Sequence, residues 1–355
     1  MLDPAADLAD LFQAVVDVES VSGHETALAD AVEAALRPYG HLRVSRHGDA
    51  VVARTALGRS RRVVVAGHLD TVPPAGNLPS RRESRDGVPV LAGRGTVDMK
   101  GGVAVQLALA AALAAPRYDL TWLFYDHEEV EAAKNGLARL AAADPALLAG
   151  DFAILMEPTA GVVEGGCQGS LRVVLTAAGR AAHAARGWLG VNAVHALGPA
   201  LATLAAYTGR VAVVDALEYR EGLNAVRVAG GTASNVIPDR ATLEVNYRFA
   251  PDRSLAEAEA HVRALFPGYG CAVVDAAPAA RPGLDAPLAA DLVAAVGQPA
   301  RPKYGWTDVA RFAALGVPAV NFGPGDPNLA HTDDEHAPLA QVAACRDALA
   351  RWLAG

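Results

Sequence analysis

The segment RVVVAGHLD, residues 62–70, carries the strongest indication of the fold. Its first half is a short β-branched run, which is typical of a strand buried on both faces. His68 and Asp70 follow where that strand would end. In open α/β sheets the ligand crevice lies at the carboxyl ends of the strands, so this segment predicts both a sheet and a site.

Further apolar segments alternate with helical patterns along the chain. Residues 1–40 are typical of two helices, and Ser22 and Glu25 have the spacing of a capping box with Ser22 as N-cap. An apolar helix is predicted at 101–115, and strands are predicted at 43–55, 121–125, 152–156 and 317–322. This alternation indicates an α/β fold with a mixed sheet flanked by helices.

The middle of the chain has a different pattern. Strands are predicted at 171–177, 222–229, 241–249 and 271–276, and helices at 192–207 and 255–266. The order β-α-β-β-α-β is that of a ferredoxin-like α+β domain. A chain of 355 residues also exceeds the roughly 250–300 residues of one core. We therefore predict a domain at 170–284 inserted into a split domain made of 1–169 and 285–355.

The composition and charge of the chain argue against several classes of protein. The formal net charge is −8 and no basic run occurs, which argues against a nucleic-acid partner. Three widely spaced cysteines argue against a disulfide framework and favour a reducing compartment. The acidic N-terminus does not resemble a signal peptide, and the longest apolar run, 103–115, is too short to span a membrane. We expect a cytoplasmic protein without a membrane partner.

Polar residues of metal-ligand type follow the predicted strands. They are His68, Asp70, Glu128, Glu129, Glu157 and His331, together with Asp98 in the Gly-rich loop 93–102. The two histidines and the carboxylates of Asp98, Glu129 and Glu157, without cysteine, suit zinc, cobalt or manganese. Two metals about 3.5–4 Å apart need a shared carboxylate, and this inventory contains enough groups for that. Taken singly, each residue also has a structural explanation, such as a hydrogen-bonded histidine, a solvated glutamate pair or a plain turn.

The two pairs of neighbouring polar residues suggest a division of roles. Asp70 lies two residues after His68 and could accept the other ring N–H of that histidine, fixing its tautomer. Glu128 and Glu129 would point in opposite directions on extended backbone, so one could bind metal while the other reaches a water molecule. In the inserted domain, His183 and Asn235 fall in polar loops, and Arg248 falls in an apolar strand where its charge needs a partner. A carboxylate on the substrate could be the partner of this arginine.

The chain resembles the zinc aminoacylase and carboxypeptidase superfamily over nearly its whole length. The segments that carry the resemblance are GHLDTVP (67–73), GRGTVDMKGG (93–102), EE (128–129), EPT (157–159), GRAAHAARGWLGVNA (179–193), SNVIPD (234–239) and AHTDDE (330–335). Within that superfamily, FYDHEEVEAAKNGL (124–137) is similar to the form found in actinobacterial succinyl-diaminopimelate desuccinylases.

The resemblance implies a role for each candidate. His68 and Glu157 would bind one zinc ion, Glu129 and His331 the other, and Asp98 would bridge them. The Asp98–Met99 peptide would be cis. Asp70 would orient His68, and Glu128 would be the general base and then the general acid. The inserted domain would be a lid and a dimerisation domain, with His183 stabilising the oxyanion in the partner subunit's site. Asn235, Arg248 and Thr307 would contact substrate.

The implied reaction is hydrolysis of N-succinyl-LL-2,6-diaminopimelate to succinate and LL-2,6-diaminopimelate in lysine biosynthesis. An acetylornithine deacetylase, an N-acyl amino acid hydrolase or a metallocarboxypeptidase would share the same metal core, and a non-catalytic metal-binding or peptide-binding protein is a further alternative. The sequence departs from the family's pattern at two places. Cys167-Gln168 stand where many members have basic residues, which bears on the contact with the succinyl carboxylate. Tyr125-Asp126-His127-Glu128-Glu129 stands where the common form is Thr-x-Asp-Glu-Glu, with the acid pair intact.

Overall fold

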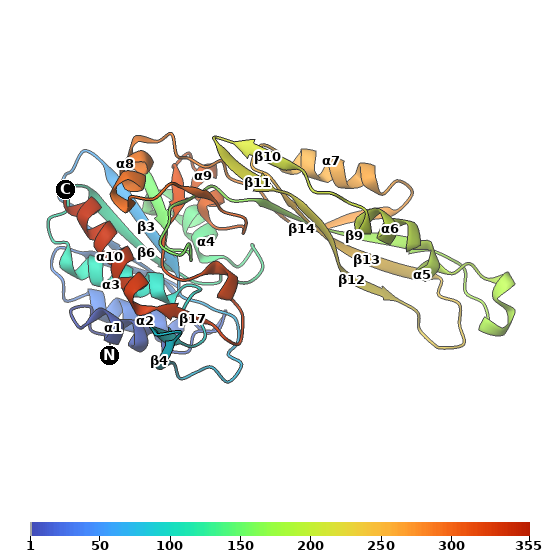
Figure 1. The fold of residues 1–355 in the computed structure, drawn as a ribbon, viewed down its shortest axis with the longest axis horizontal. Helices are drawn as coiled ribbons and strands as arrows, with labels where there is room; N and C mark the ends of the chain where they lie inside the picture. Colours follow the sequence, from blue (N-terminus) through green and yellow to red (C-terminus); the bar gives the residue numbers. More distant parts are fainter. Residues whose placement is uncertain (1) are drawn as a thin grey trace. The chain divides into compact units, whose positions relative to one another are not determined.

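The computed structural model describes residues 2–355, which form two compact units (Figure 1). The first unit contains the residues up to Gly166 together with Pro282–Arg301 and Thr307–Gly355. The second contains Cys167–Arg281 and Pro302–Trp306. The second unit thus begins three residues before the predicted domain 170–284, ends its main segment three residues earlier, and also includes residues 302–306.

The first unit is built on an eight-stranded mixed sheet with the order β1-β2-β6-β3-β7-β16-β8-β15. Strand β3 pairs in parallel with β6 and with β7, whereas β2 pairs with β6 in the antiparallel sense. The strands are β1 (Arg43–His47), β2 (Ala50–Arg54), β3 (Arg62–His68), β6 (Asp119–Tyr125), β7 (Phe152–Leu155), β8 (Glu164–Gly165), β15 (Arg301–Pro302) and β16 (Ala319–Asn321). Both faces of β3 and β6 are buried, as their continuous apolar runs predict.

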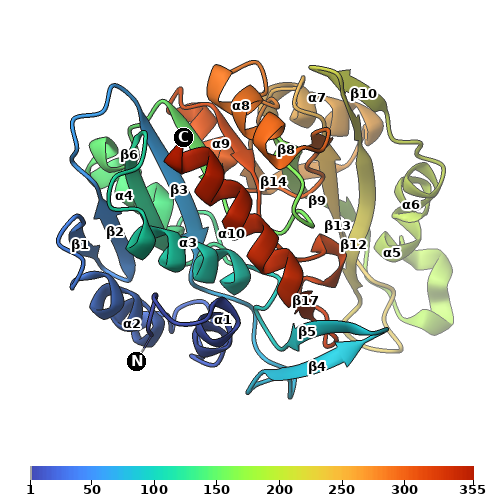
Figure 2. The same ribbon diagram turned by 60° about the vertical axis from the view of Figure 1, so that its left-hand side comes forward.

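Helices cover both faces of this sheet. They are α1 (Leu8–Val16), α2 (Thr26–Leu36), α3 (Lys100–Ala112), α4 (Gly136–Ala143), α8 (Pro287–Val296), α9 (Val309–Ala314) and α10 (Leu339–Ala354). Figure 2 shows α3 and α10 in front of the sheet and α4 and α9 behind it. The expected α/β class with a mixed sheet is confirmed.

A small second sheet in the first unit has the order β17-β5-β4. Its strands are β4 (Arg81–Arg85), β5 (Val88–Ala92) and β17 (His336–Pro338). Strand β17 is antiparallel to β5, and His336 is opposite Ala92. The Gly-rich loop that follows Ala92 and the C-terminal loop that precedes His336 therefore leave this sheet side by side.

The second unit has a four-stranded antiparallel sheet with the order β12-β13-β9-β14. Its elements are β9 (Gly169–Ala178), α5 (Ala193–Ala196), α6 (Gly198–Ala205), β10 (Val211–Val214), β11 (Leu217–Arg220), β12 (Gly222–Gly230), β13 (Arg240–Phe249), α7 (Leu255–Leu265) and β14 (Gly270–Ala277). One face carries alternating apolar residues of β9 and β13, among them Val173, Leu175 and Val245, which form a core with the helices. Strands β10 and β11 pair with each other as a hairpin, which follows α6 and precedes β12 along the chain.

Three local predictions are wrong. Helix α2 has Glu25 as its N-cap and no side-chain cap, because the Ser22 hydroxyl donates to Asp70 instead. Residues 43–55 form a hairpin and not one strand, with a turn at the positive-φ residue Gly48. The helix expected at 192–207 is divided into α5 and α6, with a proline in the first turn of α6.

Two further expectations concern cysteines and membranes. All three cysteines are free, so the prediction that they form no disulfide framework is confirmed. In the part of the chain that is described, residues 2–355, we find no helix that is both long and apolar enough to cross a membrane.

Candidate metal centre

His68 occupies the last position of β3, the strand between β6 and β7. Because these three strands are parallel, Glu128, Glu129 and Glu157 follow at the same edge of the sheet. At Gly67, just before His68, a Cβ would lie 2.3 Å from Oε1 of Gln106 and 2.7 Å from Cε of Met99, so glycine leaves room for these two side chains. Glycine thus allows α3, which follows the Gly-rich loop, to pack directly against the end of β3.

The carboxylate of Asp98 lies between two histidines. Its Oδ1 is 3.1 Å from Nε2 of His68, and its Oδ2 is 3.6 Å from Nε2 of His331. Nε2 of His331 is also 2.7 Å from Oε1 of Glu129, and Nε2 of His68 is 3.9 Å from Oε1 of Glu157. His68, Asp98 and Glu129 place one potential ligand atom each within 4.8 Å of one another. All five predicted ligands therefore converge, and the Asp98–Met99 peptide is cis as the resemblance implies.

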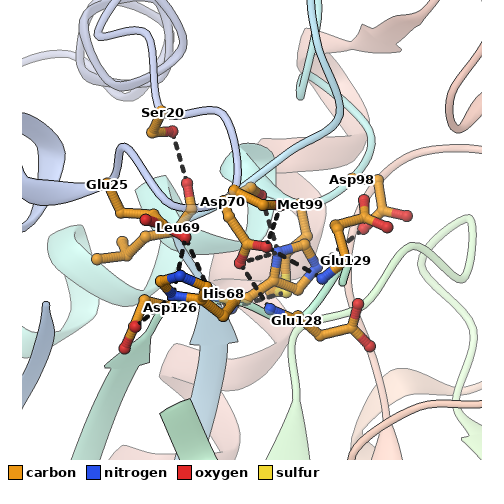
Figure 3. A network of polar contacts seen from close by, with 12 residues as sticks. Ser20, Glu25, His68, Leu69, Asp70, Asp98, Met99, Asp126, Glu128 and Glu129 are labelled. Atoms are coloured by element: carbon orange, nitrogen blue, oxygen red, sulfur yellow. Dashed lines mark hydrogen bonds and ion pairs between the residues drawn. The ribbon is translucent and has the colours of Figure 1, made fainter. Parts of the chain in front are cut away.

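The Asp70 carboxylate holds the Glu128-Glu129 backbone (Figure 3). Its Oδ1 accepts the N–H of Glu128 at 3.0 Å, and its Oδ2 accepts the N–H of Glu129 at 3.0 Å and the Ser22 hydroxyl at 2.7 Å. Burial would raise the pKa of Asp70, but the hydrogen bond to His68 and these backbone donors lower it to about 2. Asp70 is therefore a buried carboxylate that stays ionised.

The contact between Asp70 and His68 differs from the one we expected. Nδ1 of His68 is 2.9 Å from the backbone carbonyl oxygen of Asp70 and 3.5 Å from its Oδ1. The carbonyl is thus the nearer acceptor for the ring N–H. Asp70 thus offers this ring N–H two acceptors, its carbonyl and its carboxylate, and the role of the carboxylate in fixing the tautomer stays a prediction.

Carboxylates dominate the electrostatics of the site. Burial raises the pKa of Glu128 well above its usual value; the charge of His68 opposes this rise and that of Glu157 adds to it. Burial and the charge of Asp98 likewise raise the pKa of Glu129, whereas His331 opposes that rise. Grouped acids with two imidazoles match the oxygen and nitrogen donors that zinc, cobalt and manganese accept, and a divalent cation would relieve the repulsion. The donor set therefore fits a metal centre.

His183 and Asn235 lie on adjacent segments of the second unit. His183 pairs with Val236 in an isolated bridge, and the carbonyl of Asn235 accepts the N–H of Ala184 at 2.8 Å. Nδ1 of His183 accepts the N–H of Ala185 at 3.0 Å, which assigns the proton of the neutral ring to Nε2. His183 is exposed, so this Nε2–H is available as a donor.

The other two predicted substrate residues are located in different units. Arg248 lies on β13 in the second unit, where burial lowers its pKa and the charges of Asp275 and Cys167 oppose that shift. Thr307 belongs to the first unit, is buried, and donates its hydroxyl to Oδ1 of Asn321 at 2.8 Å. Their contacts with substrate remain predictions.

Several residues that support the site were not predicted to do so from the sequence. Ser22 holds Asp70, Glu335 accepts the N–H groups of Val97 and Asp98, and Arg94 pairs with Glu335. Arg94 and Glu335 lie inside two of the quoted motifs, GRGTVDMKGG and AHTDDE. Their presence in those motifs was the available signal, but a motif does not say which of its members pair.

The fold and the site together identify the class of protein. The chain belongs to the peptidase family M20/M25/M40, whose family model matches residues 64–355. It is accordingly a metal-dependent hydrolase, and the resemblance found in the sequence is confirmed.

The chain is similar over most of its length to individual members of this family. The chain is 56% identical to DapE of Mycobacterium tuberculosis over 358 residues, which cover all of both chains. It is 47% identical to the succinyl-diaminopimelate desuccinylase of Corynebacterium glutamicum, over 96% of this chain and 94% of that one. Among solved structures, aminopeptidase PepT from Bacillus cereus shares the fold with a TM-score of 0.78 at 18% identity, covering 98% of this chain and 97% of that one.

Proposed function

We propose that this protein hydrolyses N-succinyl-LL-2,6-diaminopimelate to succinate and LL-2,6-diaminopimelate in the cytoplasm. The observation that carries the proposal is the position of Asp98, whose two carboxylate oxygens face His68 and His331 at 3.1 and 3.6 Å. A shared carboxylate of this kind is what a two-metal hydrolase requires. The choice of substrate is supported by the 47% identity to the Corynebacterium desuccinylase.

Two zinc ions are the proposed cofactor, with cobalt or manganese as substitutes. His68 and Glu157 would hold one ion, Glu129 and His331 the other, and Asp98 would be shared. When bound, such ions lower the pKa of water and polarise an amide carbonyl.

Glu128 is the proposed general base. It removes a proton from the attacking water as the water oxygen bonds to the succinyl carbonyl carbon. It then delivers that proton to the amide nitrogen as the C–N bond breaks, so that one water is consumed. The backbone N–H groups of Glu128 and Glu129 both donate to Asp70, which orients the base and its neighbouring ligand from one anchor.

Residues of the second unit and Thr307 complete the proposal. A His183 supplied by a second copy of the chain would donate its Nε2–H to the developing oxyanion, so the active form would be a homodimer. The guanidinium of Arg248 suits a substrate carboxylate, and Asn235 and Thr307 would supply further polar contacts. Gln168 donates to the carbonyl of Arg220 at 2.7 Å, so its amide N–H is already engaged in the second unit.

Turnover of a substrate panel tests the proposal. Purified, zinc-loaded protein should cleave N-succinyl-LL-2,6-diaminopimelate with a higher kcat/KM than N-acetylornithine, other N-acyl amino acids or a C-terminal dipeptide. The amine released by cleavage can be followed with an amine-reactive dye. Faster cleavage of N-acetylornithine would reassign the protein to deacetylation on the same metal core. Absence of hydrolysis for all of these would reject the proposed reaction.

A further inference from the structure

A buried ion pair beside the metal centre has no part in the proposed chemistry. Arg94 and Glu335 are 3% and 1% exposed, and Nη1 of the arginine is 3.0 Å from Oε2 of the glutamate. A buried pair of this kind adds little net stability compared with apolar side chains of the same volume. Stability alone therefore does not explain this pair, and its contacts with neighbouring segments indicate another role.

Glu335 fixes the backbone that carries Asp98. Its Oε1 accepts the N–H of Val97 at 2.9 Å and the N–H of Asp98 at 3.2 Å. Because Arg94 donates to Oε2, both oxygens of the carboxylate face donors only. A carboxylate satisfies this arrangement fully, whereas an amide would direct an N–H group at one of those donors in either orientation.

Arg94 fixes the backbone next to His331. Its Nη1 also donates to the carbonyl of Thr332 at 3.0 Å, and its Nε donates to the carbonyl of Pro73 at 3.1 Å. His331 has a φ of +64°, a conformation that non-glycine residues keep only where their surroundings enforce it. The hydrogen bond to the following residue is one such constraint, and it extends to the loop after β3.

The small sheet brings these two residues to the same place. The pairing of His336 with Ala92 continues into a hydrogen bond from the Gly93 N–H to the Glu335 carbonyl at 2.9 Å. Arg94 and Glu335 thus connect three segments. These are the loop after β3, the loop before α3 and the loop before β17. These segments carry, or directly adjoin, His68, Asp98 and His331.

We infer that Arg94 and Glu335 are positioning residues, which hold Asp98 and His331 at the separation that a shared metal pair requires. This inference rests on the proposed metal centre. Neither residue contacts the reacting atoms, and neither is needed to accept or donate a proton in the reaction. Their effect should therefore appear in metal binding itself, before any substrate is added.

Cobalt binding to the full-length apo protein is the direct measurement. Glu335→Gln should weaken Co²⁺ binding by about 10- to 100-fold, the usual effect of changing a group that orients a metal ligand. The visible absorption spectrum of the bound Co²⁺ should also change, because the ligand geometry changes. Arg94→Lys keeps the positive charge but cannot reach all three acceptors, so it should shift affinity and spectrum in the same direction.

Asp119→Asn is a matched control at the opposite end of β6. Asp119 is also buried and also accepts two backbone N–H groups, those of Leu57 at 2.7 Å and Arg59 at 2.9 Å. This variant should lower the melting temperature while leaving cobalt affinity and spectrum as in the wild type. It separates general loss of stability from loss of ligand positioning.

The outcomes distinguish this inference from the proposed function. If the wild type binds cobalt and folded Glu335→Gln binds it with the same affinity and spectrum, the positioning role is overturned and the metal centre stands. If the wild type binds no cobalt or zinc, both are overturned. Should Glu335→Gln fail to fold by circular dichroism, Arg94→Lys decides by the same criteria, and equal binding by that variant also rejects the role.

Discussion

The backbone N–H of Glu128 donates to the Asp70 carboxylate at 3.0 Å, across 58 residues of sequence. Asp70 lies two residues after His68, so the end of β3 determines where the segment after β6 lies. One buried carboxylate thereby links a metal-ligand candidate to the proposed base. The positive φ of His127, at +58°, is part of the turn that directs both glutamate N–H groups toward Asp70.

Asp70→Asn should therefore impair catalysis strongly. The asparagine amide would direct an N–H group at one of the donors from Glu128, Glu129 or Ser22. We expect kcat/KM to fall by about 10- to 100-fold, as is usual when a group that orients metal ligands is changed. Ser22→Ala is the control, because it removes one donor to Oδ2 and leaves both backbone donors; it should cause a smaller loss. Wild-type kinetics for Asp70→Asn would contradict the anchoring role.

Glu128→Gln should separate metal binding from turnover. Glutamine has nearly the same shape but cannot accept the proton, so kcat should fall by about 10²- to 10⁴-fold. Metal content, measured by mass spectrometry of the dialysed protein, should equal that of the wild type. Undiminished kcat would exclude Glu128 as the base. Lost metal would instead assign it to the ligand set.

Metal removal should lower thermal stability reversibly. Without a cation, Asp98, Glu129 and Glu157 are acids clustered at one edge of the sheet, and a metal that binds only the folded chain stabilises it by mass action. At 100 times its dissociation constant the stabilisation would be about 2.7 kcal/mol. The melting temperature of chelated protein should rise with added zinc, and less so for His331→Ala. A melting temperature independent of zinc would contradict the site.

Asp119 should contribute stability that depends on pH. Burial raises its pKa, but the N–H groups of Leu57 and Arg59 and the hydroxyl of Thr55 outweigh burial and leave it lowered. The folded pKa is below the unfolded one, so the unfolded chain binds more protons in acid and stability increases with pH. Asp119→Asn should cost about 1–3 kcal/mol at pH 7. In urea titrations the difference from the wild type should shrink as the pH falls below about 4, and a constant difference would reject this account.

Tyr247→Phe should destabilise the second unit without changing the chemistry. The buried Tyr247 hydroxyl donates to Oε2 of Glu221 at 2.8 Å and accepts from Arg253 at 2.7 Å. Removing it takes one hydrogen bond from the buried Glu221, which keeps those from Arg210 and Ala250, and one from the half-buried Arg253, at a cost of about 1–3 kcal/mol. The melting temperature should fall while kcat stays unchanged. The Tyr207 hydroxyl lies 3.0 Å from Nε2 of the partly buried His261, and Tyr207→Phe should lower the melting temperature less.

The sequence by itself determined the secondary structure that places the site. Continuous apolar runs such as RVVVA predicted buried strands, and polar residues after them predicted where ligands would gather. These properties are local, because strand burial and side-chain chemistry are visible in a few consecutive residues. Even so, local signals failed where a distant partner competed. Ser22 has the spacing of an N-cap but donates to Asp70, 48 residues away.

Only the tertiary structure decided which of these side chains contact one another. Glu129 meets His331 across 202 residues, and Arg94 meets Glu335 across 241. Such pairs depend on strand order and on the register of β5 with β17, which no short stretch of sequence specifies. The segment at 62–70 therefore predicted a site, and the resemblance implied that Asp98 is shared by two metals. The folded chain was needed to show that Asp98 lies between His68 and His331 and that Asp70 anchors the Glu128-Glu129 backbone. The physical reason is that hydrogen bonds form between atoms a few ångströms apart, and packing alone brings such distant segments that close.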